Sequence, residues 1–474
     1  MSGIVGIIGS SEVATQLYDS LIQLQHRGQD AAGITTCDQR FHFKTGLGFV
    51  RDIFLERHIK RLSGTMGIGH TRYSTNGDAK NSDSIQPFWN SAPFGISFAH
   101  SGAIVNVKTL TEMVINQRRR YLNTSTCSEV LMQLFSSSLE TGLITDAKRP
   151  FFDIVTESVA ELMQLAQGSY SVISIIKDKG LVAFRDPHGI TPLVLGERQG
   201  PDGTSEYIVS SENTMFYMLG YTLLRDIHPS EVVFIEPDGT LHSTIIGKKE
   251  FNPCIFEYVY YSRPDAMENS ISVYRSRLRM GENLGKRWKQ QYGDLRPDVI
   301  IPAPATANTM ALAMAKELQT NYSDGLYKNP FIGRTFLMPD QQQRSQSVRY
   351  KLVPQQLEIR NKTVMIVDDS IVRGTTSREI VSMVRNFGAK GVYFVSACPP
   401  VIQPCFYGID IPSKETLIAA NNTVEQIRNY LQADILFFQD LEDLIEAVTR
   451  KGEHNIDMPC HACLGGPYCQ GGPK

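Results

Sequence analysis

One stretch limits what this chain can fold into more than any other, the run from Val364 to Ser377. Val364 to Val367 predict a buried strand, and the adjacent acids Asp368 and Asp369 stand where that strand ends. A turn rich in hydroxyl groups follows, and apolar residues then recur at helical spacing, at Ile380, Val381, Val384 and Phe387. Because Val392 to Val395 predict a second strand, we expect a β-α-β unit of a parallel sheet.

A ligand-binding turn is expected outside the carboxyl end of the first of these strands. Backbone N–H groups and the positive end of the helix dipole suit a phosphate, and the hydroxyls of Ser370, Thr375 and Thr376 add donors. Asp368 and Asp369 would repel that phosphate, so we expect them to hold sugar hydroxyls or Mg²⁺. The Gly-Lys-Ser/Thr ending of a triphosphate-binding loop is missing. A sugar phosphate is therefore the predicted ligand, and an ordinary turn with a surface acid pair is the alternative.

The run Val-Asp-Asp-Ser-Ile-Val-Arg-Gly-Thr-Thr resembles the 5-phosphoribosyl-1-pyrophosphate (PRPP) loop of type I phosphoribosyltransferases, in the form found in glutamine PRPP amidotransferases. The resemblance implies that PRPP or a nucleoside 5′-monophosphate binds at Asp368, Asp369, Ser370, Arg373, Gly374, Thr375 and Thr376. Thr306, after the predicted strand 299–302, takes the pyrophosphate-loop position, and Lys328 and Arg334 belong to a flap over PRPP. Mg²⁺ would bind at Thr306, Asp368 and Asp369.

The beginning of the chain places Ser2 directly before a short apolar strand. Methionine is usually removed before serine, and a free α-amine can then act as the base for its own side chain. Three further segments, 26–33, 67–75 and 185–190, resemble the glutaminase half of the same family. In that family this half is a sandwich of two antiparallel sheets between helices, and an N-terminal cysteine releases ammonia from glutamine.

The resemblance fails at three positions with separate roles. Ser2 stands where the family has the nucleophilic cysteine, Ser101-Gly102 replaces the Asn-Gly of the oxyanion hole, and Cys127 replaces the aspartate that binds the amino group of glutamine. Arg72, which would bind the glutamine carboxylate, is kept, and Thr191 replaces a common arginine.

Each of these changes is expected to weaken glutamine hydrolysis. A serine hydroxyl ionises far less readily than a thiol with its pKa of about 8.5. One lost oxyanion donor lowers the rate by about 10²–10³. A lost carboxylate partner costs about 2–5 kcal/mol of binding. We therefore interpret residues 1–248 as a glutaminase-like domain that is inactive.

Cysteines form the second informative group. Cys460 and Cys463 are separated by two residues, and with Cys254 and Cys405 they resemble the ligands of a 4Fe–4S cluster in one branch of the family. The bare spacing suits zinc equally well, and buried free thiols are the third alternative. Cys398 and Cys469 are left without a role, and Cys37 is interpreted as part of the core.

At 474 residues the chain is long enough for two or three domains. We predict an α/β protein with an α+β N-terminal half. Residues 1–248 form an N-terminal nucleophile hydrolase αββα sandwich, and residues 249–474 form a type I phosphoribosyltransferase parallel-sheet domain with a cysteine-bearing tail. The net charge of −2 argues against nucleic acid or a membrane surface as partner, and Arg118 to Arg120 are interpreted as a solvated patch. No apolar run reaches the ~18 residues of a membrane span, so a cytoplasmic location is expected.

The predicted function is phosphoribosyl transfer resembling that of amidophosphoribosyltransferases, with ammonia, another amine or a purine base in place of glutamine. Because such transfer is reversible, the chain is also a candidate for stripping a base from its nucleotide in specialised metabolism, with a partner protein. One alternative is a working glutamine-dependent enzyme of purine synthesis, in which Ser2 is a natural or engineered variant. A non-catalytic scaffold or regulatory subunit is the other. The family forms tetramers, so a homo-oligomer, a dimer or a tetramer, is expected.

Overall fold

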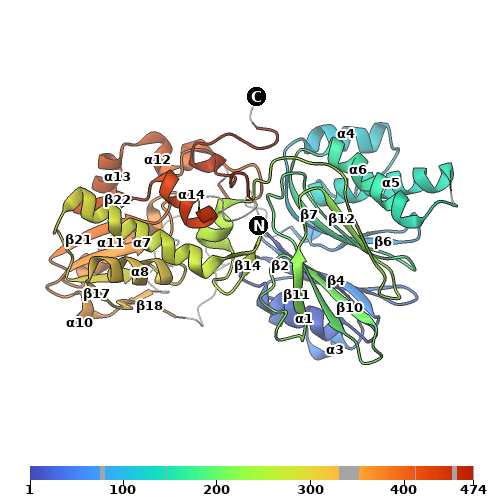
Figure 1. Cartoon of the computed structure of the whole chain (residues 1–474), viewed down its shortest axis with the longest axis horizontal. Coiled ribbons are helices and arrows are strands. Elements are labelled where there is room, and N and C mark those ends of the chain that lie inside the picture. Colours follow the sequence, from blue (N-terminus) through green and yellow to red (C-terminus); the bar gives the residue numbers. More distant parts are fainter. Residues whose placement is uncertain (75–80, 147, 330–351, 412, 451–455, 473–474) are drawn as a thin grey trace.

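The computed structural model describes the whole chain except residues 75–80, 147, 330–351, 412, 451–455 and 473–474. Its elements separate into two halves that lie side by side, and the N-terminus lies where the halves meet (Figure 1). Antiparallel sheets make up the first half, and a parallel sheet makes up the second.

Two antiparallel sheets form the centre of the first half. The seven-stranded sheet has the order β11 (Thr222–Asp226), β9 (Val194–Gln199), β10 (Ser205–Ser210), β1 (Gly3–Ile8), β4 (Met66–Arg72), β2 (Ala31–Cys37) and β3 (Phe41–Leu47). The six-stranded sheet has the order β13 (Leu241–Ile245), β12 (Glu231–Ile235), β8 (Gly180–Arg185), β7 (Gly168–Ile176), β6 (Ile96–Ile104) and β5 (Phe88–Asn90). Ile4, Ile68 and Ile173 belong to one buried cluster shared by the two sheets, so the sheets pack face to face.

Helices cover the outer face of each of these sheets. Leu17 and Leu21 of α1 (Ala14–Gln23) pack on the seven-stranded sheet, near the short α2 (Val50–Ile53) and α3 (Glu56–Ile59). On the six-stranded sheet lie α4 (Val107–Asn116), α5 (Cys127–Thr145) and α6 (Phe151–Leu165) (Figure 1). The result is the predicted αββα sandwich.

The second half contains a five-stranded parallel sheet. Its order is β17 (Asn321–Tyr322), β16 (Val299–Pro302), β20 (Thr363–Asp368), β21 (Gly391–Ser396) and β22 (Ile435–Phe438). Alternate residues of β16 and β20 point to opposite faces of the sheet, and each face has its own hydrophobic core. Helices α7 (Val273–Tyr292), α8 (Asn308–Leu318) and α14 (Leu441–Thr449) pack on one face. Helices α11 (Thr375–Asn386) and α13 (Val424–Leu431) pack on the other. Two strand pairs lie outside the three sheets, β14 (Met267–Glu268) with β15 (Ile271–Ser272) and β18 (Leu326–Lys328) with β19 (Leu352–Pro354). Further short elements are a π-helix, η2 (Glu257–Tyr261), the helices α10 (Gln356–Ile359) and α12 (Ile418–Asn421), and the 3-10 helices η1 (Ser82–Ser84), η3 (Lys414–Thr416) and η5 (Ala462–Leu464).

The β-α-β unit predicted from the run after Val364 is confirmed as β20, α11 and β21. Ile380, Val381 and Val384 are buried as expected. Phe387 is not, because α11 ends at Asn386 and Phe387 is its C-terminal cap residue, 36% exposed. The predicted boundary at residue 248 follows the last strand of the antiparallel sheets and stays a prediction.

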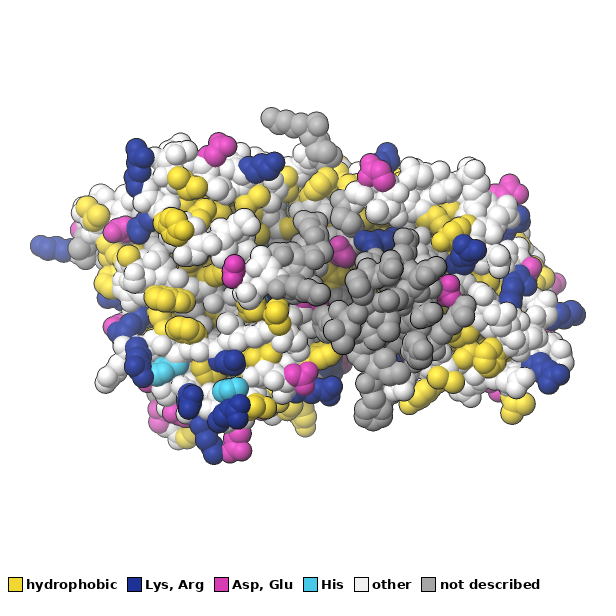
Figure 2. All heavy atoms as spheres, turned by 180° about the vertical axis from the view of Figure 1, so that it is seen from behind, with side chains coloured by type: hydrophobic (Ala, Val, Ile, Leu, Met, Phe, Trp, Pro, Cys, Tyr) yellow, Lys and Arg dark blue, Asp and Glu magenta, His cyan; other side chains and the backbone are white. Residues whose placement is uncertain are grey.

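Charged side chains do not separate into one-signed regions on the face in Figure 2, where Lys and Arg are interspersed with Asp and Glu. Arg118 and Arg120, read from the sequence as a solvated patch, form ion pairs with Glu161 and Glu140. No helix among the described residues is long and apolar enough to cross a bilayer.

Candidate functional site

The paired acids lie at the carboxyl edge of the parallel sheet. Asp368 is the last residue of β20, and Asp369 follows it. Strands β16 and β20 are neighbours, but the chain leaves them for opposite sides of the sheet, β17 on one side and β21 on the other. Ligands of open parallel sheets bind in the crevice at such a switch point. The position of the acids is therefore that of a ligand site.

Two loops meet at these acids. The Ser370 hydroxyl donates to Asp369 Oδ1 at 2.6 Å, and the Asp369 N–H donates to Asp368 Oδ1 at 2.9 Å. From the loop after β16, the Thr306 side chain approaches Asp369 closely enough to favour its ionised form. The structure thus brings together Thr306, Asp368, Asp369 and Ser370, four residues that the sequence assigned to one site.

The burial and mutual repulsion of the two carboxyl groups would favour the binding of a cation or of sugar hydroxyls beside them. Burial raises the pKa of Asp369 to about 6, although Ser370, Arg277 and Thr306 favour its ionised form. Burial and the neighbouring carboxylate of Asp369 raise the pKa of Asp368 well above its ordinary value. Hydroxyl donors or a divalent cation would relieve this repulsion. Oxygen donors from one hydroxyl and two carboxyls suit Mg²⁺, which proteins commonly bind through one or two carboxylates plus substrate phosphates.

The turn after the acids leads directly into α11. Gly374 caps the helix with a φ of +75°, and Thr375 and Thr376 are the first helical residues. Glycine is favoured here by the backbone conformation, and a Cβ atom, which would lie 2.7 Å from Ile418 Cδ1, would in addition require that side chain to shift. Free N–H groups of the first helical turn suit an anion.

Other residues of the predicted PRPP site are less closely placed. Arg373 is exposed on the same turn. Lys328 ends β18, whose partner strand is β19, and it is exposed on that separate two-stranded sheet. Arg334 lies outside the described residues, as does most of the predicted flap.

In the first half, Ser2 and Ser101 are in direct contact. The Ser2 Oγ accepts from the Tyr73 N–H at 3.2 Å, and the Ser101 hydroxyl donates to the Ser2 carbonyl oxygen at 2.7 Å. Arg72 ends β4 beside Tyr73, and its Nη1 donates to the Asn81 carbonyl oxygen at 2.7 Å. The strands thus bring the predicted nucleophile, oxyanion and carboxylate positions to one place.

The side chains at these positions differ from those that the family resemblance assigned to glutamine hydrolysis. In this structure the hydroxyl of Ser101 is used by the backbone of Ser2. Gly102 keeps a φ of +134°, and a Cβ there would lie 2.2 Å from the Ser169 carbonyl oxygen. Cys127 is the first residue of α5, and burial raises the pKa of its thiol, so it offers no negative charge. The nearby Glu129 carboxylate instead accepts from the N–H groups of Asn123 and Thr124.

Comparison with known proteins identifies the family. A glutamine amidotransferase domain matches residues 70–217. Amidophosphoribosyltransferases from Pseudomonas aeruginosa and Escherichia coli are 44% and 45% identical, covering 99% and 98% of this chain and 93% and 92% of their own lengths. The chain belongs to the amidophosphoribosyltransferase family. The solved structure of glutamine PRPP amidotransferase from B. subtilis, complexed with ADP and GMP, superposes with a TM-score of 0.85 at 32% identity, covering 99% of this chain and 97% of that one.

Membership of the amidophosphoribosyltransferase family confirms the predicted fold, a glutamine amidotransferase domain followed by a phosphoribosyltransferase parallel sheet. The same relationship assigns the chain to a family of enzymes that carry both domains. Neither the full-length similarity nor the fold shows a disabled glutaminase.

The four cysteines assigned to a cluster are buried or half-buried and come from three separate segments. Cys254 and Cys460 form a parallel β-bridge, and the Cys463 carbonyl oxygen accepts from the N–H groups of Ile402 and Gln403, close to Cys405 in the chain. Burial raises the pKa of Cys463 well above its ordinary value, and Cys405, Cys254, Cys398 and Cys460 add to the shift, so the Cys463 thiol lies within electrostatic reach of the three other assigned cysteines and also of Cys398.

The type of these donors suits either an iron–sulfur cluster or a zinc ion. Among the described residues, no group of three or more His, Cys, Asp or Glu side chains is arranged to hold a metal ion. The 4Fe–4S assignment stays a prediction.

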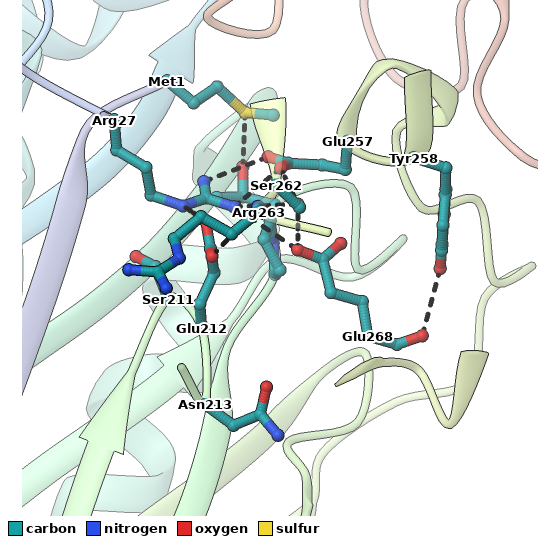
Figure 3. Close-up of polar contacts among 12 residues, drawn as sticks. Met1, Arg27, Ser211, Glu212, Asn213, Glu257, Tyr258, Ser262, Arg263 and Glu268 are labelled. Atoms are coloured by element: carbon teal, nitrogen blue, oxygen red, sulfur yellow. Dashed lines mark hydrogen bonds and ion pairs between the residues drawn. The ribbon is translucent and has the colours of Figure 1, made fainter. Parts of the chain in front are cut away.

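Sequence reasoning missed two features near these sites. Cys469, left without a role, lies close enough to Cys460 to raise the pKa of the Cys460 thiol. Arg27 is fully buried between the two halves and pairs with Glu212, Glu257 and Glu268 (Figure 3). Nothing local in the sequence signals these pairs, because their members are 185 to 241 residues apart.

Proposed function

We propose that this chain transfers the 5-phosphoribosyl group of PRPP to a nitrogen nucleophile at the carboxyl edge of its parallel sheet. The observation that carries the proposal is the convergence of Thr306, Asp368, Asp369 and Ser370 beside the Gly374 turn. The acids would hold the ribose hydroxyls while the turn and the N-terminus of α11 bind the 5′-phosphate. Fixing the sugar in this way exposes C1 to the nucleophile and stabilises the oxocarbenium-like transition state.

Mg²⁺ belongs to this proposal. Thr306, Asp368 and Asp369 are the residues that would hold it. When bound, Mg²⁺ neutralises charge that develops on the departing pyrophosphate.

The nitrogen source has two candidates. The first candidate is free ammonia, another amine or a purine base. It is supported by Ser2, Ser101 and Cys127, because each of them replaces a side chain that glutamine hydrolysis uses in the family. Similarity to amidophosphoribosyltransferases over nearly the full length favours the second candidate, glutamine hydrolysed with Ser2 as nucleophile. The family relationship supports purine nucleotide metabolism as the setting for both.

The experiment supplies PRPP and Mg²⁺ with either glutamine or ammonium chloride, and measures pyrophosphate release and glutamate release separately. Under the first candidate, ammonium supports pyrophosphate release and glutamine supports neither product above background. The Ser2→Cys, Ser101→Asn and Cys127→Asp changes, made stepwise and then together, are expected to increase glutamate release, with about 10²–10³ from the oxyanion donor alone. Ser91→Cys, at an exposed position of the same half, controls for the added thiol.

Glutamate release by the unmodified chain at the rate of its pyrophosphate release would establish the second candidate. A panel of amines and purine bases, run in both directions, then identifies the acceptor and tests base removal from a nucleotide. Absence of PRPP and nucleotide binding by calorimetry would refute the transfer proposal and favour a scaffold. Sedimentation of the same sample tests the expected homo-oligomer.

A further inference from the structure

A buried polar cluster joins the two halves of the chain. Arg27 and Glu212 come from the first half, and Glu257, Ser262 and Glu268 come from the second (Figure 3). We call these five residues the seam. The side chains of Arg27, Glu212, Glu257 and Glu268 are at most 1% exposed, so water does not balance their charges.

Hydrogen bonds of the seam converge on one hydroxyl. Ser262 Oγ lies 2.7 Å from Glu257 Oε2 and is also hydrogen-bonded to Glu268 Oε1. Arg27 Nη2 donates to the same Oγ at 3.2 Å and to Glu257 Oε2 at 2.7 Å. A serine hydroxyl has one proton and two lone pairs. It cannot donate to both carboxylates, so one of the two carboxyls must bring a proton of its own.

The arrangement that satisfies every group assigns this proton to Glu268. The Glu268 carboxyl then donates to Ser262 Oγ, which donates to Glu257 Oε2, while Arg27 fills the second lone pair of the hydroxyl. Glu257 is the better anion because it accepts two bonds from the guanidinium, at 3.2 and 2.7 Å, whereas Arg27 Nη2 is 3.4 Å from Glu268 Oε1.

The hydrogen bonds of Arg27 lead to the same residue. Arg27 is the guanidinium that hydrogen-bonds to the carboxyls of the seam, and Glu212 already receives its Nε and the His26 imidazole. Arg185 and Arg277 act on Glu268 through charge alone, because their own hydrogen bonds go to backbone carbonyl oxygens and to Asn269. Burial raises the pKa of Glu268 well above its ordinary value; Glu257 adds to the shift, and Arg27 opposes it. The titratable and charged groups that face Glu268 from the surrounding elements are Arg27, Glu212, Glu257, Tyr258, Arg185 and Arg277.

We propose that Glu268 is a positioning residue that stays a protonated carboxylic acid at neutral pH, and that its proton holds the two halves together. Loss of the proton places a negative charge on Glu268 next to that of Glu257. It also removes the hydrogen bond that the Glu268 carboxyl donates to Ser262 Oγ. The seam is then weakened as pH rises.

The seam matters for both candidate sites because its residues support their backbones. Arg27 Cβ lies 3.4 Å from the position of a Cβ on Gly3, next to Ser2. Tyr261, beside Ser262, packs edge-on against Tyr73, whose N–H binds Ser2. On the other side, Arg277 donates to the carbonyl oxygens of Tyr258 and Ser262, and its charge reaches Asp369.

The test compares the full-length protein with Glu268→Gln, which keeps a donor but cannot ionise. Glu56→Gln is the matched control, since Glu56 is 81% exposed and pairs only with Lys60 on the surface. Infrared spectra of the unmodified protein at neutral pH are expected to contain a buried carboxylic-acid C=O band. The intensity of that band should be lower in Glu268→Gln and unchanged in Glu56→Gln; the intensity that remains in Glu268→Gln belongs to other buried acids such as Asp368, whose pKa is also raised. In Ser262→Ala the acid keeps its proton but loses its acceptor, so the band is expected to shift.

Stability against urea, followed by the fluorescence of the buried Trp288, gives the second readout. The pKa of Glu268 is raised in the folded state. The contribution of Glu268 to the free energy of unfolding is therefore complete at pH values below the ordinary glutamate pKa of about 4.3, and it is lost as the pH rises toward the pKa of Glu268 in the folded state. In this range the unfolding constant of the unmodified chain is expected to rise by up to about tenfold per pH unit more than that of Glu268→Gln. An unchanged infrared band in Glu268→Gln, or equal pH slopes in the two proteins, would overturn the proposal.

Discussion

Exchanging Asp369 for asparagine is expected to stabilise the free protein and to weaken PRPP binding. The pKa of Asp369 is about 6 against an ordinary 3.8, so folding makes its ionised form unfavourable. At 1.36 kcal/mol per pH unit this difference corresponds to at most about 3 kcal/mol at neutral pH. Stability of the unmodified chain should therefore fall as pH rises from about 4 to about 6, and Asp369→Asn should lack this fall.

Ligand binding is expected to change in the opposite direction. If Asp369 accepts a hydrogen bond from a ribose hydroxyl, the loss of its charge removes about 1.5–3 kcal/mol. That range corresponds to PRPP binding about 10- to 150-fold weaker in the presence of Mg²⁺. A variant that is more stable yet binds less tightly cannot be explained by misfolding.

Urea unfolding at several pH values and titration calorimetry with PRPP measure the two effects on the same samples. Asp440→Asn is the control, since Asp440 lies in the same half, is half exposed and pairs with Arg287 on the surface. Equal PRPP affinity in Asp369→Asn and Asp440→Asn would refute the assignment of the acids to the ribose. Lower stability of Asp369→Asn would refute the electrostatic argument.

Three further changes test the fold and the tail. Gly374→Ala forces a side chain into a left-handed conformation 2.7 Å from Ile418 Cδ1, so urea unfolding should show a loss of at least about 1–2 kcal/mol, with weaker PRPP binding. Trp288→Ala empties a fully buried site and removes the Nε1 bond to the Leu295 carbonyl oxygen, which should cost about 3–5 kcal/mol in urea unfolding followed by far-UV circular dichroism. Purified protein is expected to contain iron and to absorb broadly in the visible range, and Cys463→Ser should lose both while Cys37→Ser keeps them.

The second half could be predicted from sequence because its signals are local. Val364 to Val367 and the helical spacing of Ile380, Val381 and Val384 each lie within one element, and the acids follow directly. Phe387 shows the limit of this reasoning. Periodicity places it on the buried face, whereas the helix ends one residue earlier and leaves it exposed.

Contacts between residues far apart in the sequence are not indicated by any local sequence pattern. The segment 26–33, which contains Arg27, resembles a family motif, but nothing in it indicates that this side chain meets Glu257, 230 residues away. Cys469 was left without a role, yet the tail folds back and brings its thiol close enough to Cys460 to raise the pKa of that cysteine. Sequence patterns therefore identified which residue types carry chemistry and missed which of them share a buried environment.

The first half is needed by the second whatever its own chemistry. Met1 and Ile190 belong to the same buried cluster as Trp288 and the inner face of the parallel sheet. The Ser169 hydroxyl donates to the Tyr407 carbonyl oxygen at 2.6 Å, beside the cysteines. Without Arg27, Glu257 would be a buried carboxylate that has lost its guanidinium, and breaking such a pair costs about 3–5 kcal/mol. A chain that no longer hydrolysed glutamine would thus still keep the sandwich, because the phosphoribosyl half is built against it.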